Sequence, residues 1–133
     1  MSGTRVLDSY ALLSFFQGER GSAQVEALLN QAEQSGDNLL MSAVNWGEVY
    51  YSIMRKLGAA VADEKAAQID LMALDIIDAD KVLTRTAAQM KASHSLAYGD
   101  CFAAALAKQR KGELVTGDRE FEVLADEIRI LWI

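Results

Sequence analysis

The chain alternates between short apolar runs and longer segments in which apolar residues recur at helical spacing. Short apolar runs are typical of strands buried on both faces, whereas the spacing i, i+3, i+4, i+7 is typical of amphipathic helices. Because parallel strands are joined through helices, the alternation predicts a mainly parallel sheet with helices on both faces. The expected strands are residues 5–8, 39–41, 76–77, 114–116 and 128–133.

Capping residues mark the starts of several predicted helices, and glycines mark several of their ends. Ser42 and Asp80 are favourable N-cap residues. Asp100 is expected to open a helix of small apolar residues, which stops at a basic turn followed by Gly112. The expected helices are residues 9–16, 22–35, 42–57, 60–73, 80–92, 100–111 and 119–125. In the helix 80–92, the residues expected to face inward are Val82, Leu83, Thr86, Ala87 and Met90.

The composition is that of an ordinary globular protein, with 51% hydrophobic and 24% charged residues among 133. This length predicts a single domain. No apolar run approaches the length of a membrane span and the first residues lack a signal-peptide pattern, so a soluble, cytoplasmic protein is expected. With Cys101 and His94 the only residues of their kinds, one chain cannot form an internal disulfide, a cysteine zinc site or a histidine-rich metal site. Cys101 is interpreted as a small core residue.

The net charge of −6 and a pI near 4.7 limit how this chain can bind nucleic acid. A protein that coats nucleic acid through bulk positive charge would be basic. An enzyme that reaches phosphate through a bound metal ion remains compatible with the acidic composition. The charge therefore excludes a passive DNA-coating protein but leaves a metal-dependent phosphodiesterase open.

Four acidic residues occupy positions next to predicted strands. Asp8 and Asp118 each follow an apolar strand, and Glu48 and Asp100 lie on helices that adjoin strands. Ligands of open α/β sheets bind outside the carboxyl ends of the strands. Carboxylates that meet there repel one another unless a cation neutralises them. A hard cation such as Mg²⁺ prefers oxygen ligands of this kind, so the pattern suggests a metal-dependent acidic site.

Simpler interpretations of the same acids remain open. Asp8, Asp100 and Asp118 could each act only as a helix cap, since Asp is a favoured N-cap residue. Glu48 could close a capping box with Asn45, or it could be solvated. The second option arises because Glu48 falls roughly opposite the apolar stripe of its helix, which comprises Trp46, Val49, Tyr50, Ile53, Met54 and Leu57.

Several segments resemble the PIN-domain ribonucleases, and more narrowly the VapC-type toxins of toxin–antitoxin pairs. The segments are VLDSYALL at 6–13, SAVNWGEVYYSIMRK at 42–56, LAYGDCFAAALAKQRKGELVTGDREF at 96–121 and the closing strand. The resemblance covers essentially the whole chain, and its most specific part is the GD-x-x-x-A-A-x-A segment followed by L-V-T-G-D. It implies a single PIN domain over residues 1–133, with a three-layer α/β/α sandwich around a mainly parallel sheet of about four to five strands.

The resemblance also assigns roles to individual residues. It places the acidic site, both catalytic and metal-binding, on Asp8, Glu48, Asp100 and Asp118, with Glu48 acting directly or through water. Ser9 and Thr116 match hydroxyl residues that would support the site. Some relatives carry a further acid, whose place Glu120 or Glu122 could fill. Arg119 stands where many relatives have proline. Arg55 and Arg119 are possible RNA contacts, although a solvated or salt-bridged role for Arg55 is equally open.

The implied activity is Mg²⁺- or Mn²⁺-dependent endonucleolytic cleavage of RNA, often of tRNA or ribosomal RNA. A metal-activated water would attack the phosphate in line and leave 5′-phosphate and 3′-hydroxyl ends. The implied partners are a cognate antitoxin and a second copy of the chain in a homodimer, with no membrane. Tyr50, Tyr51 and Met54 are candidate antitoxin contacts, although the packing stripe favours a core position for Tyr50 and Met54.

Other functions would use the same fold. The chain could be a PIN-like module that binds RNA or protein without cutting it, or a housekeeping RNA-processing nuclease. A phosphohydrolase of similar α/β build is disfavoured, because Asp8 is followed by Ser-Tyr-Ala and not by a close second acid. Only a neighbouring antitoxin gene would separate a toxin from a housekeeping nuclease.

Overall fold

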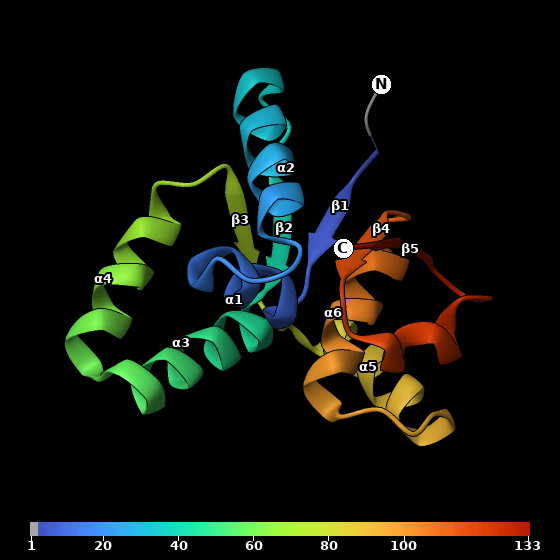
Figure 1. Cartoon of the computed structure of the whole chain (residues 1–133). Coiled ribbons are helices and arrows are strands. Elements are labelled where there is room, and N and C mark those ends of the chain that lie inside the picture. The colour runs from blue at the N-terminus through green and yellow to red at the C-terminus, as the bar shows by residue number, and fades with distance from the viewer. Residues whose placement is uncertain (1–2) are drawn as a thin grey trace.

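A five-stranded, wholly parallel sheet in the order β3-β2-β1-β4-β5 forms the centre of the computed structural model, which describes residues 3–133. Helices cover both faces of this sheet (Figure 1), which confirms the predicted three-layer α/β fold. In chain order the elements are β1 (Arg5–Leu7), α1 (Ser9–Gln17), α2 (Ser22–Ser35), β2 (Leu39–Ser42), α3 (Ala43–Leu57), α4 (Ala59–Asp70), β3 (Leu74–Ile77), α5 (Lys81–Ser93), α6 (Tyr98–Gln109), β4 (Glu113–Thr116), the 3₁₀ helix η1 (Arg119–Leu124) and β5 (Arg129–Trp132).

The first strand lies at the centre of the sheet. Val6 is in register with Leu40 of β2 on one side and with Leu114 of β4 on the other. Successive side chains of a strand point to opposite faces, so Val6 and Leu7 enter different cores, and both are fully buried. A strand segment covered on both faces must be apolar, which explains why residues 6–7 of β1 and residues 39–41 of β2 form short hydrophobic runs.

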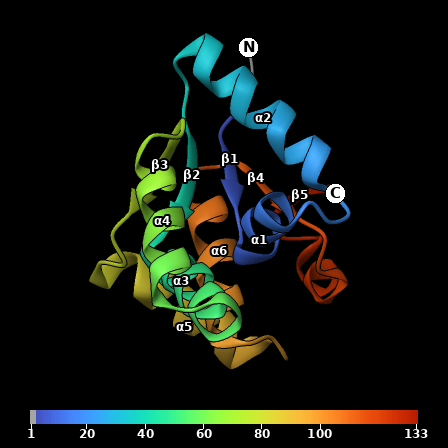
Figure 2. The ribbon, with the colours of Figure 1, turned by 60° about the vertical axis from the view of Figure 1, so that its left-hand side comes forward.

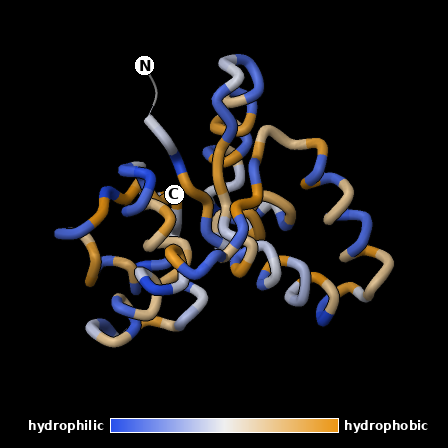
Figure 3. Tube along the Cα trace, turned by 180° about the vertical axis from the view of Figure 1, so that it is seen from behind, coloured by the Kyte–Doolittle hydropathy of each residue, from blue (hydrophilic) through white to orange (hydrophobic). Residues whose placement is uncertain are grey.

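Two hydrophobic cores separate the three layers. On one face the sheet packs against α5, α6 and η1, and on the other against α1, α2, α3 and α4. Hydrophobic and hydrophilic positions alternate along most helices (Figure 3), as expected for helices with one face in a core. In α6, by contrast, every residue from Cys101 to Ala107 is buried, because this helix lies between the sheet and α5. The core position predicted for Cys101 is therefore confirmed.

All strands run in the same direction, so their carboxyl ends share one edge of the sheet. Figure 2 shows the arrowheads of β1 and β2 pointing toward the end where α1, α3 and α6 come together. At the opposite end lie the turn after α2 and the C-terminus of α6. No helix within residues 3–133 has the length and hydrophobicity needed to cross a membrane.

The start and the end of α6 differ from the prediction. Asp100 does not open the helix: α6 begins at Tyr98 with Ala97 as its N-cap, which places Asp100 in the first turn. At the other end, the left-handed residue is Lys111, with φ of 53°, and not Gly112. Gly112 is needed for a different reason, since a Cβ there would lie 2.5 Å from the carbonyl oxygen of Thr4. The glycine therefore permits the close approach of β1 and β4.

Three residues of the predicted apolar stripes are exposed. Val82 on α5 is 64% exposed, and Met54 and Leu57 on α3 are 37% and 56% exposed, so the inward positions predicted for them are wrong. Each lies at the border of its helix stripe, where a periodic pattern alone does not tell whether another element covers the residue. Tyr51 is 47% exposed. Two helices also differ from the prediction. Residues 119–124 form a 3₁₀ helix. The helix predicted over 60–73 spans Ala59–Asp70, and β3 begins soon after it, at Leu74.

Candidate active site

Asp8 lies at the carboxyl end of β1 and is the N-cap of α1. Its Oδ1 accepts a 2.8 Å hydrogen bond from the backbone N–H of Ala11, and its Oδ2 accepts a 2.5 Å bond from the hydroxyl of Thr116. The side chain is only 2% exposed. The capping role is therefore real, but it accounts for only one of the two carboxylate oxygens.

Burial dominates the electrostatics of Asp8. The pKa of Asp8 is raised to about 7, mainly because the side chain is buried away from water. The two hydrogen bonds act against this shift, whereas the charges of Asp100 and Asp118 add a smaller upward contribution. That smaller contribution indicates that Asp100 and Asp118 lie close enough to Asp8 to repel its negative charge.

Asp118 is held in the turn that follows β4. Thr116 connects it to Asp8, because the same Thr116 hydroxyl that donates to Asp8 accepts a 3.0 Å bond from the N–H of Asp118. Asp118 Oδ1 accepts a 3.0 Å hydrogen bond from the N–H of Glu120, so Asp118 also caps η1. Because β1 and β4 are adjacent, this turn brings the two acids to the same edge of the sheet.

Asp100 projects from the first turn of α6 toward the same edge. Burial, together with the charges of Asp118, Glu48 and Glu120, raises the pKa of Asp100 to about 6. Carboxylate oxygens of Asp100, Asp118 and Glu120 all lie within 4.8 Å of one another. The structure thus brings an additional acid, Glu120, to the predicted site. Glu122, the other candidate, instead lies 3.5 Å from Arg119 in an exposed ion pair.

Glu48 extends from α3 to the first turn of α6. Its Oε1 accepts a 2.8 Å hydrogen bond from the side-chain amide of Asn45, which also donates a 3.0 Å bond to the carbonyl of Gly99. A Cβ on Gly99 would lie 2.3 Å from Oε2 of Glu48, so only glycine leaves room for this carboxylate. Glu48 is therefore partly buried beside Asp100, and the solvated interpretation is wrong.

Asn45 and Gly99 both lie against Glu48, and neither was among the site residues predicted from the sequence. The capping-box interpretation of Asn45 and Glu48 is also wrong, because Ser42 is the N-cap of α3 and Asn45 contacts Glu48 through its side chain. A glycine directly before the predicted acid was the available signal for Gly99. Its meaning depends on the packing of α3 against α6, which a local pattern does not reveal.

The donor set fits a hard divalent cation. All candidate ligands are carboxylates, which Mg²⁺ and Mn²⁺ prefer over nitrogen or sulfur. Mutual repulsion and burial raise the pKa values of Asp8 and Asp100, and a bound cation would relieve both effects. Asp8, Glu48, Asp100 and Asp118 meet at the carboxyl ends of the central strands, where α/β sheets bind their ligands.

The predicted supporting and RNA-contacting residues lie around this centre. Ser9 is the first residue of α1 and is partly buried, whereas Thr116 is fully buried against Asp8. The guanidinium of Arg119 lies 4.3 Å from the centroid of the Trp132 ring. That of Arg55 lies 5.0 Å from the centroid of the Tyr51 ring. Both arginines therefore stack on aromatic rings.

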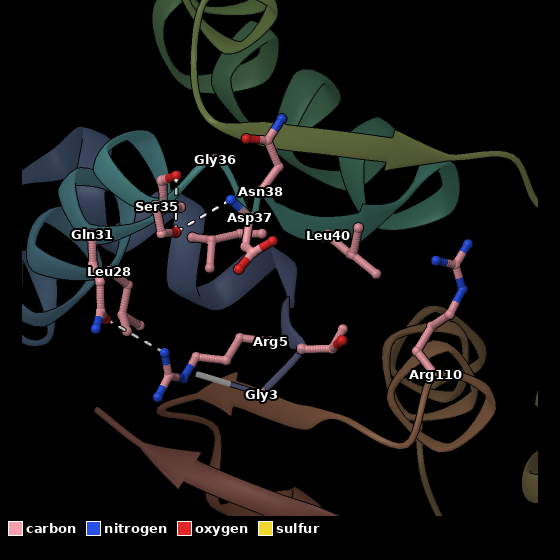
Figure 4. A pocket seen from close by; sticks show the side chains of 13 residues that line it. Gly3, Arg5, Leu28, Gln31, Ser35, Gly36, Asp37, Asn38, Leu40 and Arg110 are labelled. Carbon is pink, nitrogen blue, oxygen red and sulfur yellow. Dashed lines mark hydrogen bonds between the residues drawn. The ribbon is translucent and has the colours of Figure 1, made fainter. Parts of the chain in front are cut away.

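A polar cavity of about 380 Å³ lies at the opposite end of the sheet, between β1, the end of α2 and the end of α6 (Figure 4). Arg5 points across it to Gln31, at 3.5 Å, and also pairs with Glu113 at 3.2 Å. Arg110, in the basic turn that follows α6, is one of its lining residues. This turn is separated from Asp100 by most of the helix, roughly 15 Å at the rise of an α-helix. Neither the cavity nor the basic turn contributes to the acidic site.

Comparison with known proteins identifies relatives of the fold and the site. The family model of the PIN domain matches residues 5–127. Among curated proteins, none matches the sequence. Among solved structures, the chain is similar to DNA-bound VapBC from Salmonella typhimurium, with a TM-score of 0.77, 18% identity and 97% of each chain covered.

Two further solved structures agree over nearly the whole chain. VapBC2 from Rickettsia felis, bound to a promoter DNA fragment, gives a TM-score of 0.76 at 14% identity, with 98% of each chain covered. VapC20 from Mycobacterium tuberculosis, described as a Sarcin-Ricin loop cleaving toxin, gives 0.69 at 13% identity, with 90% of this chain and 94% of that chain covered. At these identities the agreement concerns the fold.

Proposed function

This chain belongs to the PIN domain family, and we propose that it is a metal-dependent endoribonuclease acting as the toxin of a VapBC-like pair. One observation carries the proposal: carboxylates from four separate elements meet at the carboxyl edge of the sheet, where burial and mutual repulsion raise the pKa values of Asp8 and Asp100. The similarity to VapBC structures, to one structure described as a toxin–antitoxin complex and to one described as a Sarcin-Ricin loop cleaving toxin supports the choice of RNA and of a protein inhibitor.

In the proposed mechanism, Asp8, Asp100 and Asp118 would hold Mg²⁺ or Mn²⁺ through carboxylate oxygens. Such a cation, when bound, would lower the pKa of a water so that it can act as the nucleophile, and would neutralise charge that develops on the phosphate. Asp8 is the most rigid ligand, because Ala11 and Thr116 hold both of its oxygens. Asp118 is aimed by the same Thr116 hydroxyl. The expected product ends would be 5′-phosphate and 3′-hydroxyl, since water and not the ribose 2′-hydroxyl would attack.

Glu48 and Glu120 would complete the site from opposite sides. Glu48, held between Asn45 and Gly99, binds the cation directly or through water, or accepts a proton from the attacking water. Glu120 shares a 4.8 Å cluster with Asp100 and Asp118, and it can hold a water or a second cation there. Arg119, one residue after Asp118, and Arg55, seven residues after Glu48 on α3, are the positive charges proposed to contact RNA phosphates.

The proposed antitoxin would cover an apolar groove between α1 and α4. Leu71, at the end of α4, is 89% exposed, although leucine is usually buried. The groove beside it is lined by Phe15, Phe16, Lys65, Gln68, Leu71 and Met72. Tyr51 and Met54 on α3, the helix that carries Glu48, are also exposed. An amphipathic antitoxin helix would fit such a groove, and a following segment could reach the acids.

A homodimer of this chain is also proposed.

Cleavage of total bacterial RNA by the purified full chain tests the proposal, with the RNA ends mapped. Discrete cuts are expected with Mg²⁺ or Mn²⁺, none with chelator, and none with Asp100→Asn. Asp70→Asn, a change of the same kind at an exposed position that ends α4, should cut like the unchanged chain. Ends carrying 2′,3′-cyclic phosphate would contradict water as the nucleophile. Cleavage that survives chelation would contradict the metal.

The same assay separates the alternative functions. A non-catalytic PIN module would bind RNA without discrete cuts, and the complete set of acids argues against it. A housekeeping nuclease would cut but would have no antitoxin partner. Purification with the product of an adjacent small gene, followed by loss of cleavage in the complex, would identify the toxin.

A further inference from the structure

We propose that Asn45 is a positioning residue of the active site, which orients the Glu48 carboxylate for cation binding. This inference rests on the proposed metal-dependent function and deepens it. Asn45 is fully buried, although an asparagine side chain is usually exposed, and each of its side-chain polar atoms has a partner. A buried amide with every bond satisfied rigidifies its surroundings.

The hydrogen bonds around Asn45 fix which way its amide faces. The carbonyl of Gly99 and the carboxylate of Glu48 can only accept hydrogen bonds, so the NH₂ group of Asn45 must face both of them. On the other side, the Ser42 hydroxyl accepts from the N–H of Asn45 at 3.2 Å and donates to its Oδ1 at 2.7 Å. The amide therefore has one allowed orientation, with its donors directed at Glu48.

The same amide joins two elements that carry candidate ligands. Glu48 lies on α3, and Gly99 directly precedes Asp100 on α6. By donating to both, Asn45 sets the distance between the Glu48 carboxylate and the first turn of α6. Within residues 3–133, the Glu48 carboxylate accepts one hydrogen bond, from Asn45, and it accepts this bond through Oε1. This leaves Oε2, which lies over Gly99, as the oxygen available to a cation or a water.

A purely structural role for Asn45 would predict something different. An amide that only caps α3 would need Ser42 and the backbone, and its contribution would be independent of the charge on Glu48. Hydrogen-bond partners of metal ligands, by contrast, change metal affinity by roughly 10- to 100-fold when they are removed. The two roles therefore differ in whether the effect of losing Asn45 depends on Glu48.

The test is a double-mutant cycle read out as Mn²⁺ binding to the full chain by calorimetry, without RNA. Asn45→Ala should weaken Mn²⁺ binding roughly tenfold, since it leaves the ligand unpositioned. Glu48→Gln retains the size of the side chain but removes the charge, so adding Asn45→Ala to it should change affinity by less than about twofold. Asn38→Ala provides a matched control, because Asn38 makes a 3.0 Å bond to Asp75 on the exposed surface away from the acids.

Asn45→Ser makes the same loss of the amide donors with a milder packing change, and circular dichroism in chelator checks that each variant folds. Equal losses of affinity with and without the Glu48 charge would overturn the proposal, as would a variant that binds Mn²⁺ like the unchanged chain. RNA cleavage distinguishes the two levels. If the effect of Asn45→Ala on Mn²⁺ affinity depends on Glu48 but the chain does not cut RNA, the role of Asn45 stands and the nuclease function is contradicted. If the chain cuts RNA but the two substitutions act independently on Mn²⁺ affinity, the nuclease function stands and the role of Asn45 is contradicted.

Discussion

The hydroxyl of Thr116 donates a 2.5 Å hydrogen bond to Oδ2 of Asp8, a residue 108 positions earlier in the chain. Both residues are buried, and the bond joins the carboxyl ends of the adjacent strands β1 and β4. The same hydroxyl accepts from the N–H of Asp118. One threonine thus positions two of the candidate ligands and makes the larger of the two hydrogen-bond contributions that lower the pKa of the buried Asp8.

Thr116→Val should therefore destabilise the protein and impair the site. Valine has the shape of threonine but no hydroxyl, so Asp8 Oδ2 and the N–H of Asp118 both lose a partner. Leaving a buried acceptor unsatisfied costs about 1–3 kcal/mol of unfolding free energy. Urea denaturation in chelator measures this loss. Thr116→Ser, which retains the hydroxyl, should lie close to the unchanged protein, and equal losses for both variants would contradict this role of the hydroxyl.

The raised pKa of Asp100 makes the metal-free protein more stable in acid. Its ordinary value is 3.8 and its value in the folded chain is about 6, so the folded state holds the proton more tightly than the unfolded state does. The stabilisation from this proton is complete below about pH 4 and is lost as the pH rises to about 6. Asp100→Asn, which is neutral throughout, should raise the melting temperature in chelator at pH 8 relative to the unchanged chain. At pH 4 the two should differ little; a constant difference at both pH values would contradict the shift.

Cation binding should release protons near pH 6. At that pH Asp8, with a pKa of about 7, is mostly protonated and Asp100, with a pKa of about 6, is roughly half protonated. Both must ionise to bind a cation, so roughly one proton or more should leave per cation. Calorimetry of Mn²⁺ binding in two buffers with different ionisation enthalpies counts these protons. At pH 8.5 the release should vanish, and a release that does not depend on pH would exclude these two acids as its source.

Much of the fold could be predicted because it depends on local patterns. The caps Ser42 and Asp80 accept hydrogen bonds from residues three positions later, and such contacts are visible in the sequence. Strand positions followed from uninterrupted apolar runs. The start of α6, by contrast, was predicted at Asp100 but lies at Tyr98. The N-cap residue is Ala97, whose side chain cannot accept a capping hydrogen bond, so the sequence carries no capping residue that marks this start.

All four acids were predicted as site residues, and the prediction is most direct for the two acids that follow a strand. Asp8 and Asp118 fall at the carboxyl ends of neighbouring strands, so the parallel topology alone brings them together. Glu48 looked solvent-facing on a helical wheel, because a wheel cannot show that α6 covers that side of α3. Glu120 and Glu122 were both candidates for the additional acid of the site. In the structure η1 directs Glu120 to Asp100 and Asp118, whereas Glu122 pairs with Arg119.

Arg119 should contribute to RNA affinity and not to the chemical step. Its exposed guanidinium stacks on Trp132 one residue after Asp118, which places a positive charge next to the acids. Arg119→Gln should weaken RNA binding about three- to tenfold and reduce the salt dependence of binding by about one charge, measured in the Asp100→Asn background to prevent cleavage. Arg129→Gln is the control, because Arg129 starts β5 at the opposite end of the sheet. Equal effects from both would indicate only bulk charge.

Two glycines near Glu48 allow the sharpest test of the geometry. A Cβ on Gly99 would lie 2.3 Å from Oε2 and 2.7 Å from Cδ of Glu48, whereas a Cβ on Gly47 would have no atom within 4 Å. Gly99→Ala should displace the end of one side chain and leave the fold intact, because a carboxylate can rotate away where a backbone cannot. Displacement of about 1 Å in a catalytic group can cost roughly a hundredfold in rate, so cleavage should fall by about that factor.

Gly47→Ala changes the residue directly before Glu48 and should leave cleavage unchanged. It should also stabilise α3 by about 0.5–1 kcal/mol, since alanine is a better helix former than glycine. The pair therefore separates the position of the Glu48 carboxylate from general effects of alanine on these helices. Single-turnover cleavage and thermal unfolding of both variants provide the comparison. Full activity in Gly99→Ala would mean that Glu48 takes no part in the reaction from its position over Gly99, because that position no longer exists once the Cβ is present.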